Sequence, residues 1–295
     1  MKILICGASG FVGRHLTKTL QQAGHDVARG IRKPALASDI AVDFSKDTDK
    51  GVWLPRLDGF DTVINVVGVL RDTQDQPMLK LHEQTPLALF AACQEMGIRR
   101  IVQGSALGVD QGIETAYFQT RRKPEDFVRN LPEPMRWLIT RPSVIYGEDG
   151  ASAKMFRLQA SLPVHTLPAG GKQRLQPVHI DDICEAVARW LTDPDAESQI
   201  VTCVGAEATD MRGMLDSYRQ QQGKGNALHI GVPYALVKLA AKIGDFIPAS
   251  PLCSDTLTML NAGNTGDATA FTQLLGRPPR SYRTFLADEA SHVGG

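Results

Sequence analysis

The chain has 295 residues, of which 43% are hydrophobic and 22% are charged, a composition typical of an ordinary globular protein with a substantial core. Thirty-two basic residues balance thirty-two acidic ones, so the net charge does not indicate nucleic acid or an anionic membrane as the main partner. Five scattered cysteines without metal-ligand spacing indicate reduced thiols and a cytoplasmic protein.

The chain opens with a βαβ pattern. Residues 2–6, KILIC, form an apolar run typical of a buried parallel strand. Every fourth position from Val12 to Leu20 is apolar, which predicts a helix that ends at Gly24, and residues 26–32 supply a second strand. The opening is too short in apolar length for a signal peptide, and no stretch approaches the length of a transmembrane helix.

Three glycines occupy the turn between the first strand and the helix, spaced G-x-x-G-x-x-G. Gly7 allows a tight turn, and Gly10 lets backbone amides approach a pyrophosphate at the positive end of the helix. Gly13 lets helix and strand pack closely. The alternative is a glycine-rich turn without a ligand. Because the motif lies between a strand and an amphipathic helix, we interpret it as a dinucleotide-binding site.

The end of the second strand, RGIRKPA, indicates which dinucleotide binds. An NAD site usually places Asp or Glu there, whereas an NADP site uses arginine for the 2′-phosphate. No acidic residue lies between Val27 and Ala37, whereas Arg32 and Lys33 are placed to meet a phosphate and Arg14 could add a third positive charge. The alternative is a solvated basic loop. The pattern favours NADP(H) over NAD(H).

Four more strands complete the prediction of an α/β fold with a parallel sheet. The third is predicted at IAVDFS, ending in Asp43, and the fourth at DTVINVVGV, finishing at Gly68. The fifth is predicted at RRIVQGSALG, which delivers Gly104 and Ser105, and the sixth at WLITRPSVIYG, which Arg141–Pro142 ends. Ligands of open α/β sheets bind at the carboxyl edge, where these strand ends meet the glycine turn.

The segment AYFQTRRKPEDF, residues 116–127, raises the question of catalysis. Tyr117 and Arg121 are four residues apart and would share one face of a helix, where a cation favours the ionised form that acid–base chemistry needs. Arginine supplies the charge but does not copy the compact ammonium of lysine. Because Pro124 disfavours a helix interior, the regular helix is expected to begin near Pro124, with Tyr117 in a looser turn. The alternative is that Tyr117 only packs against the cofactor or closes the pocket.

The segment PVHIDDICEAV contains His179, Asp181 and Asp182, which together look like a metal cluster. A capping aspartate explains the spacing better, and Asp182 with Glu185 has the form of a capping box. His179 is interpreted as a hydrogen-bonded structural residue in a short strand. The prediction is therefore that these residues hold no metal.

The segment YALVKLAAKIGDF is predicted to be a helix with a narrow polar stripe made by Lys238, Lys242 and Asp245. Such a helix is usually buried against the rest of the domain. The alternative is that residues 233–247 lie on a membrane surface or on a partner protein.

Together these motifs resemble the extended and atypical short-chain dehydrogenase/reductases, which are similar to NAD(P)-dependent epimerases and dehydratases. The matching pieces are GASGFVG, VINVVG, GSALG, the Tyr117 segment, TRPSVIYG and QPVHIDDICEAV. The tail, VPYALVKLAAKIGDFIP with AFTQLLGRPP, is similar to one branch, the NADPH-binding accessory subunit of respiratory complex I.

The resemblance implies a Rossmann-type, doubly wound parallel sheet with a smaller, mainly helical C-terminal substrate lobe. We expect residues 1–146 to form the dinucleotide-binding core and 147–295 the lobe, with 176–204 returning to the core sheet. The expected cofactor-binding residues are Gly7, Ser9, Gly10, Phe11, Val12, Arg32, Lys33, Asp43, Phe44, Val67 and Gly68.

The resemblance also implies three catalytic residues. In active relatives a serine or threonine at the position of Ser105 bonds the substrate oxygen, and a tyrosine at the position of Tyr117 transfers a proton. A lysine four residues later holds the nicotinamide ribose, and Arg121 stands in its place here.

Three hypotheses about function follow. The first is an NADP(H)-dependent oxidoreductase that acts on a small carbonyl, alcohol or quinone. The second is a non-catalytic NADPH-binding structural, assembly or redox-sensing protein. A third and weaker hypothesis is a nucleotide-sugar epimerase or dehydratase.

Overall fold

The structure is a computed structural model that describes residues 1–247 and 250–287. The chain forms two compact units. The N-terminal unit contains Met1–Arg141 and Cys184–Val201, and the C-terminal unit contains Pro142–Ile183 and the chain from Thr202 onward. The first segment of the N-terminal unit ends at Arg141, a few residues before the boundary at residue 146 that the sequence suggested.

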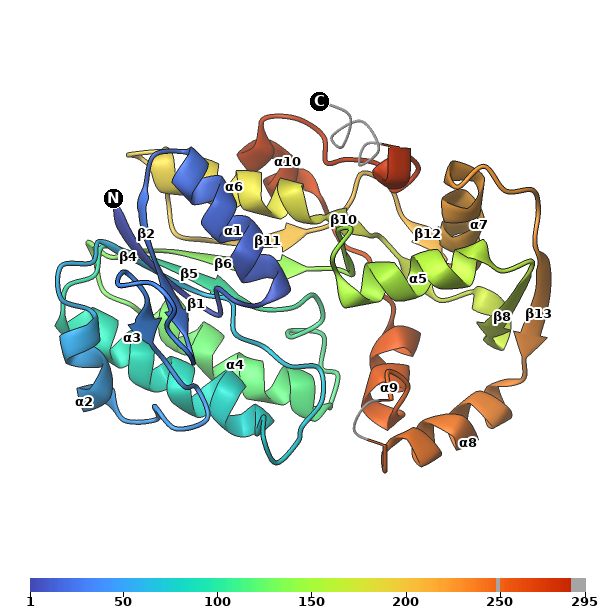
Figure 1. The fold of residues 1–295 in the computed structure, drawn as a ribbon, viewed down its shortest axis with the longest axis horizontal. Helices are drawn as coiled ribbons and strands as arrows, with labels where there is room; N and C mark the ends of the chain where they lie inside the picture. Colours follow the sequence, from blue (N-terminus) through green and yellow to red (C-terminus); the bar gives the residue numbers. More distant parts are fainter. Residues whose placement is uncertain (248–249, 288–295) are drawn as a thin grey trace. The chain divides into compact units, whose positions relative to one another are not determined.

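A seven-stranded sheet forms the centre of the N-terminal unit (Figure 1). Its strands are β1 (Lys2–Cys6), β2 (Asp26–Ile31), β3 (Ile40–Ala41), β4 (Thr62–Asn65), β5 (Arg100–Gly104), β6 (Arg136–Pro142) and β11 (Gln199–Cys203). They lie in the order β11-β6-β5-β4-β1-β2-β3, and the pairings from β3 through to β6 are parallel. The order reverses between β1 and β4, and such a reversal is where α/β sheets bind ligands. The predicted doubly wound α/β fold is confirmed.

Helices cover both faces of this sheet (Figure 1). One face carries α1 (Phe11–Gln22) and α6 (Ile180–Thr192), and the other carries α2 (Lys50–Trp53), α3 (Thr85–Glu95) and α4 (Ala116–Arg129). A 3₁₀ turn, η1 (Leu54–Arg56), follows α2, and a π-helical turn, η2 (Lys80–Gln84), leads into α3. Because both faces are covered, the central strands are buried: β4 along its whole length, and β1 at every residue after Lys2.

Two strands are shorter than the sequence predicted. β3 ends at Ala41, so Asp43 follows the strand, and β4 ends at Asn65, before Gly68. The Asn65 side chain accepts a hydrogen bond from the Val67 N–H at 3.2 Å and donates to the Gln103 side chain at 2.8 Å. A polar side chain that bonds the backbone in this way competes with the strand ladder and turns the chain away from it.

The prediction that the regular helix begins near Pro124 is wrong. α4 begins at Ala116, its start is capped by the Thr115 side chain, which accepts from the Phe118 N–H, and Pro124 lies inside the helix. Pro124 removes one donor, the N–H that would bond the carbonyl of Thr120, and this costs about 3 kcal/mol. Pro124 is buried, so packing of the helix against the core offsets that cost.

The C-terminal unit is mainly helical. Its helices are α5 (Ala151–Ser161), α7 (Met211–Gln221), α8 (Tyr234–Gly244), α9 (Ser254–Ala262) and α10 (Thr269–Leu275), with a 3₁₀ turn η3 (Ala169–Gly171). Among its described residues, short strands pair as β7 (Ile145–Tyr146) with β10 (Val178–His179), β8 (Val164–Pro168) with β13 (Leu228–Val232), and β9 (Arg174–Leu175) with β12 (Thr209–Asp210). Its core is rich in aromatic side chains, among them Tyr146, Tyr218 and Phe285.

Asp182 is not the capping residue that the sequence predicted. Its side chain is fully buried and accepts hydrogen bonds from Arg277 at 2.7 Å and from the Arg280 backbone at 2.7 Å, and it pairs with the Arg280 guanidinium. His179 lies in β10, and its Nδ1 accepts the Asp181 N–H at 3.2 Å, so the prediction of a hydrogen-bonded structural histidine is confirmed.

The prediction that α8 is a buried helix is only partly right. Val237 and Ala241 are buried and pack on Leu257 of α9. The other apolar side chains of the helix are exposed, because α9 is too small to cover more than one side. They include Leu236, Leu239 and Ile243. Within the described chain, no helix is long and apolar enough to cross a membrane.

Replacing Gly13 with alanine should destabilise the N-terminal unit. A Cβ at Gly13 would lie 2.1 Å from the Gly7 carbonyl oxygen and 2.7 Å from the Ala8 Cα, and these backbone atoms cannot move aside as a flexible side chain could. We expect the free energy of unfolding to fall by about 3 kcal/mol in urea titrations. Gly225→Ala, where a Cβ meets nothing within 4 Å, is the matched control. Equal stability of the two variants would contradict the close packing.

Candidate functional site

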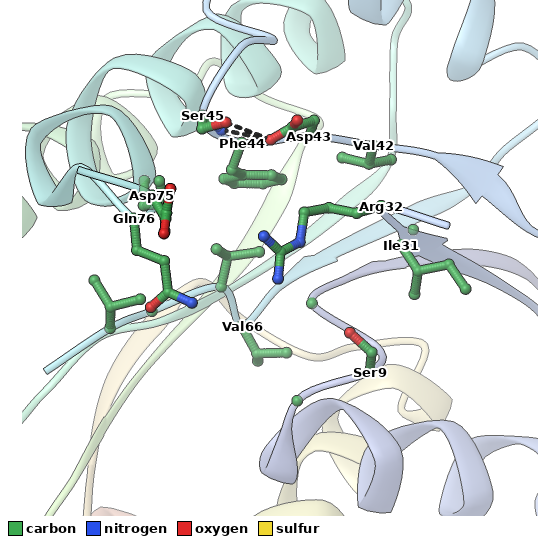
Figure 2. Close-up of a pocket in the computed structure, with 17 residues that line it drawn as sticks. Ser9, Ile31, Arg32, Val42, Asp43, Phe44, Ser45, Val66, Asp75 and Gln76 are labelled. Atoms are coloured by element: carbon green, nitrogen blue, oxygen red, sulfur yellow. Dashed lines mark hydrogen bonds between the residues drawn. The ribbon is translucent and has the colours of Figure 1, made fainter. Parts of the chain in front are cut away.

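A cavity of about 230 Å³ lies at the carboxyl edge of the sheet in the N-terminal unit (Figure 2). It is bounded by the β1–α1 turn, the end of β2, the segment after β3 and the segment after β4. The lining residues are Gly7, Ser9, Gly10, Gly30, Ile31, Arg32, Val42, Asp43, Phe44, Ser45, Val66, Val67, Gly68, Val69, Asp75, Gln76 and Leu81. The cavity therefore occupies the place where the strand order reverses.

The glycine turn forms one wall of this cavity. Gly7 has φ +86°, and a Cβ there would lie 3.1 Å from the backbone of Val66 and Val67. Gly10 precedes α1, whose first turn contains no acidic side chain. The unbonded N–H groups of the first turn and the positive end of the helix macrodipole therefore lie at the cavity. No carboxylate of this turn competes for them, so the site suits a phosphate.

Arg32 brings a positive charge into the cavity. Figure 2 shows its guanidinium extending into the space beside the ring of Phe44. No carboxylate of the described residues pairs with Arg32. The acid nearest the end of β2 is Asp39, which is held by Arg29 in two hydrogen bonds of 2.8 Å and by the N–H groups of Ala35 and Leu36. Asp39 is therefore engaged in shaping the loop, and Arg29 holds the pKa of its carboxyl well below the usual range.

Asp43 and Phe44 form the wall opposite the glycine turn. The Asp43 carboxylate accepts from the Ser45 hydroxyl at 2.6 Å and from the Ser45 N–H at 3.0 Å, drawn as dashed lines in Figure 2. These bonds lower the pKa of Asp43, so the carboxylate is ionised at neutral pH. Phe44 is buried and packs edge-on against Trp53 at 5.6 Å, which fixes the ring beside the cavity.

Four other residues discussed for the cofactor lie outside the lining of this cavity. Phe11 and Val12 open α1 and are partly buried, and the Phe11 ring packs on His15. Lys33 is exposed. Arg14 donates to the Ser9 carbonyl at 2.7 Å. Through this hydrogen bond Arg14 stabilises the glycine turn from outside the cavity.

Tyr117 and Arg121 lie together on α4. The Arg121 guanidinium stacks over the Tyr117 ring at 4.5 Å from its centroid, a cation–π contact. It also donates to the Gly104 carbonyl at 3.2 Å and lies 3.3 Å from Nε2 of His82. A Cβ on Gly68 would lie 2.6 Å from Nη2 of Arg121, so the guanidinium lies directly against the Gly68 wall of the cavity.

Arg121 is a buried cation without an anion. It is 6% exposed, its Nε has no hydrogen-bond partner, and no carboxylate of the described chain pairs with it. A buried charge is costly unless a partner compensates it. The Arg121 guanidinium can therefore bind an anionic or polar group of a ligand that enters the cavity next to Gly68.

His82, on the π-helical turn η2, contacts both Tyr117 and Arg121. Its Nε2 accepts the Val69 N–H at 2.9 Å, so Nδ1 carries the proton and faces Thr120 Oγ1 at 3.2 Å. Its ring packs edge-on against Tyr117 at 5.6 Å. Burial and then the charge of Arg121 lower the pKa of His82 to about 2, so the imidazole is neutral.

Ser105 follows Gly104 at the end of β5. Its N–H bonds the Thr140 carbonyl at 2.8 Å, which fixes the backbone, while its hydroxyl is buried and has no hydrogen-bond partner. Buried hydroxyls normally find partners, so Ser105 Oγ is a free donor and acceptor at the sheet edge.

A family model described as the NAD dependent epimerase/dehydratase family matches residues 3–205 of the chain. The chain belongs to this family.

Two curated relatives have names of different kinds: one is a reductase and the other is a subunit of a dehydrogenase complex. The Ceramide reductase of Caulobacter vibrioides is 28% identical over 65% of this chain and 61% of its own length. Subunit 9 of the NADH dehydrogenase [ubiquinone] 1 alpha subcomplex of Mus musculus, a mitochondrial protein, is 25% identical over 68% of this chain and 56% of its own length. The chain thus spans less than two thirds of the length of either relative.

A solved structure shares the fold along nearly the whole chain. The human epimerase family protein SDR39U1, determined with NADPH, superimposes with a TM-score of 0.76 at 20% identity and covers 99% of both chains. Together with the cavity at the sheet edge, family membership makes this an NAD(P)-binding fold of the short-chain dehydrogenase/reductase type.

Sequence reasoning missed several side chains of this epimerase/dehydratase-type site. His82 bonds the segment after β4 and contacts Arg121, while Asp75 and Gln76 line the cavity. They lie in a loop and a π-helical turn that follow no periodic pattern. The signal that could have directed attention there is the irregular run between the fourth strand and the next helix, since π-helical turns often mark functional sites.

The neutral His82 should make stability depend on pH. Its pKa is lowered on folding, so below pH 6.5 the unfolded chain takes up a proton that the folded chain refuses, and stability falls with falling pH. Between pH 7.5 and 5.0 we expect this histidine to account for a loss of about 2 kcal/mol in the free energy of unfolding. Urea titrations of wild type and His82→Gln at both pH values measure it. The same pH dependence in both proteins would contradict the assignment.

Proposed function

We propose that this chain is an NADP(H)-dependent oxidoreductase of the atypical short-chain class, acting on a small carbonyl, alcohol or quinone. The observation that carries the proposal is the unpaired guanidinium of Arg32 inside the cavity at the carboxyl edge of the sheet. Five buried cysteines are compatible with a reducing compartment such as the cytoplasm.

The choice of NADP(H) rests on the charges at the end of β2. A 2′-phosphate is a dianion that a planar guanidinium binds through two parallel hydrogen bonds. An NAD site would need a free carboxylate for the ribose hydroxyls, and Asp39 is committed to Arg29. Asp43 and Phe44 then flank the adenine, and the glycine turn with the start of α1 holds the pyrophosphate.

The proposed chemistry places three side chains around the reacting carbonyl. When bound, NADPH supplies the hydride that reduces the carbonyl carbon. Ser105 Oγ, which is buried and unpartnered, orients the substrate oxygen. Tyr117 gives its hydroxyl proton to that oxygen, so that an alcohol forms, and it takes a proton in the reverse direction. Arg121, stacked on the Tyr117 ring, stabilises the tyrosinate left behind.

Arg32→Ala should weaken NADPH binding selectively. Loss of a charged hydrogen-bond pair costs about 1.5–3 kcal/mol, so we expect the Kd for NADPH to rise by about 10- to 100-fold while the Kd for NADH stays within about threefold. Fluorescence titration of both dinucleotides measures this. Arg99→Ala is the matched control, because Arg99 is exposed, pairs with Asp61 and precedes β5 at the opposite edge of the sheet, so it should change neither Kd. Equal losses for both dinucleotides in Arg32→Ala would refute the phosphate contact.

Tyr117→Phe should abolish turnover without abolishing cofactor binding. We expect NADPH oxidation with a panel of quinones, ketones and aldehydes to fall by about 10²- to 10⁴-fold, the contribution of a general acid. The Kd for NADPH should stay within a few fold. Tyr234→Phe, on the exposed start of α8, removes a hydroxyl elsewhere and should keep wild-type rates. Equal turnover in Tyr117→Phe and wild type would exclude Tyr117 as the acid.

One observation favours a second candidate, a non-catalytic NADPH-binding structural, assembly or redox-sensing protein. The Arg121 guanidinium lies over the Tyr117 ring and donates to the Gly104 carbonyl, so it is less free than a lysine ammonium to hold a ribose diol. The complex I subunit among the relatives supports a role within an assembly. Residues 233–247, with their exposed apolar side chains, would then contact a protein or membrane partner.

The same panel separates these candidates. Tight NADPH binding by wild type, with no turnover of any compound and no effect of Tyr117→Phe, favours the binder. A dinucleotide that stays bound through purification would instead favour a nucleotide-sugar epimerase or dehydratase, because such enzymes return the hydride to the same cofactor within one turnover.

A further inference from the structure

Three polar side chains in the C-terminal unit converge from elements that are far apart in the sequence. His165 lies on β8, His229 on β13 and Asp216 on α7. β8 and β13 are parallel neighbours, and His165 pairs in register with His229, so both rings stand on the same side of the strand pair. Their ring centroids are 5.4 Å apart. One nitrogen or oxygen atom from each of the three residues lies within 4.8 Å of the others.

The two separations between the imidazole nitrogens and Asp216 are close to those of metal ligands. Nδ1 of His165 lies 3.6 Å from Asp216 Oδ1, and Nε2 of His229 lies 2.7 Å from the same oxygen. Bonds of about 2.0–2.1 Å in tetrahedral geometry place ligand atoms about 3.3 Å apart. The first distance already fits. The second needs to open by roughly half an ångström, which a small rotation of the partly exposed Asp216 side chain provides.

His165 is the observation that points to a ligand. Its side chain is fully buried, and Nδ1 has no hydrogen-bond partner. Nε2 lies 3.4 Å from the Ala160 carbonyl, which only accepts, so the proton of the neutral ring belongs on Nε2 and Nδ1 presents a lone pair. That lone pair faces a carboxylate oxygen that is also an acceptor. A cation between the two would satisfy both, and the Nε2–H bond to a backbone carbonyl is the usual support of a metal-binding histidine.

The charges around the cluster indicate which cation fits. A cavity of about 330 Å³ adjoins His229 and Asp216 and is also lined by Arg212 and Arg219. Arg212 lies 3.9 Å from Asp216, while Arg219 donates to the carbonyls of residues 160–162. One carboxylate cannot hold a hard cation such as Mg²⁺ against two guanidinium groups. Two neutral imidazoles and one carboxylate are instead the donor set of Zn²⁺ and similar ions.

We propose that His165 Nδ1, Asp216 Oδ1 and His229 Nε2 form a binding site for a divalent transition metal of the Zn²⁺ class. The fourth coordination position faces the cavity, where water or a small anion completes the tetrahedron and the arginines favour negative charge. The metal joins β8, β13 and α7, so its first effect is to hold these three elements of the C-terminal unit together.

The experiment uses the full chain, freed of metal with a chelator and titrated with zinc chloride by calorimetry and by competition with a chromophoric chelator. We expect one zinc ion per chain and a rise in Tm of about 5 °C at a zinc concentration one hundred times the Kd. Magnesium chloride at the same concentration should leave Tm unchanged.

His229→Gln and Asp216→Asn should each weaken zinc binding by at least about 100-fold and remove the Tm shift, since each deletes a ligand. These two positions are partly exposed, so the variants should fold, and their Tm without zinc checks this. His25→Gln, in the N-terminal unit, is the matched control and should bind zinc as wild type does. Binding that is absent in wild type, or equal in all four proteins, would overturn the proposal. So would a Tm that responds to pH but not to zinc, because the cluster would then be an ion pair only.

Discussion

The close contact between the start of α1 and the end of β1 is the constraint on which the candidate cofactor site depends. At Gly13 the helix approaches the Gly7 carbonyl so closely that no side chain fits between them. This contact fixes the positive end of α1 at the carboxyl edge of the central strand, beside the point where the strand order reverses. The cavity, the glycine turn and the neighbouring strand ends take their positions from it.

Uncompensated positive charge is the second feature of the N-terminal unit. Arg32 and Arg121 have no carboxylate partner in the described chain, although other arginines there are paired, as Arg141 is with Glu125. Arg121 is buried, and a buried cation gains the protein no stability unless a partner compensates it, whereas Arg32 is exposed and lines the cavity. The neutral imidazole of His82 fits this view, because a second cation beside Arg121 would add repulsion.

The two units combine different kinds of site. The N-terminal unit has a cavity built from backbone turns and strand ends, which is the candidate dinucleotide site of this member of the epimerase/dehydratase family. The C-terminal unit has a compact histidine and aspartate cluster between a strand pair and a helix. The cavity depends on the backbone geometry of the glycine turn. The cluster depends on an imidazole lone pair that faces a carboxylate oxygen, so the two sites can be tested independently.

The sequence by itself determined the elements whose signals are local. The apolar strand of residues 2–6, the helix spacing up to Leu20, the left-handed stop at Gly24 and the glycine turn each depend on near neighbours. They were enough to predict the doubly wound fold. Of the cofactor residues that the family resemblance implied, eight are among the seventeen that line the cavity.

Only the tertiary structure decided the features that depend on distant partners. Pro124 remains inside α4 because burial offsets one lost hydrogen bond, and Asp182 pairs with arginines that lie far along the chain instead of capping its own helix. The exposure of α8 depends on how little of it α9 covers. His165 meets His229 through strand pairing, and packing alone brings Asp216 to them. No local pattern records such contacts, because their free energy comes from residues that the chain brings together only when it folds.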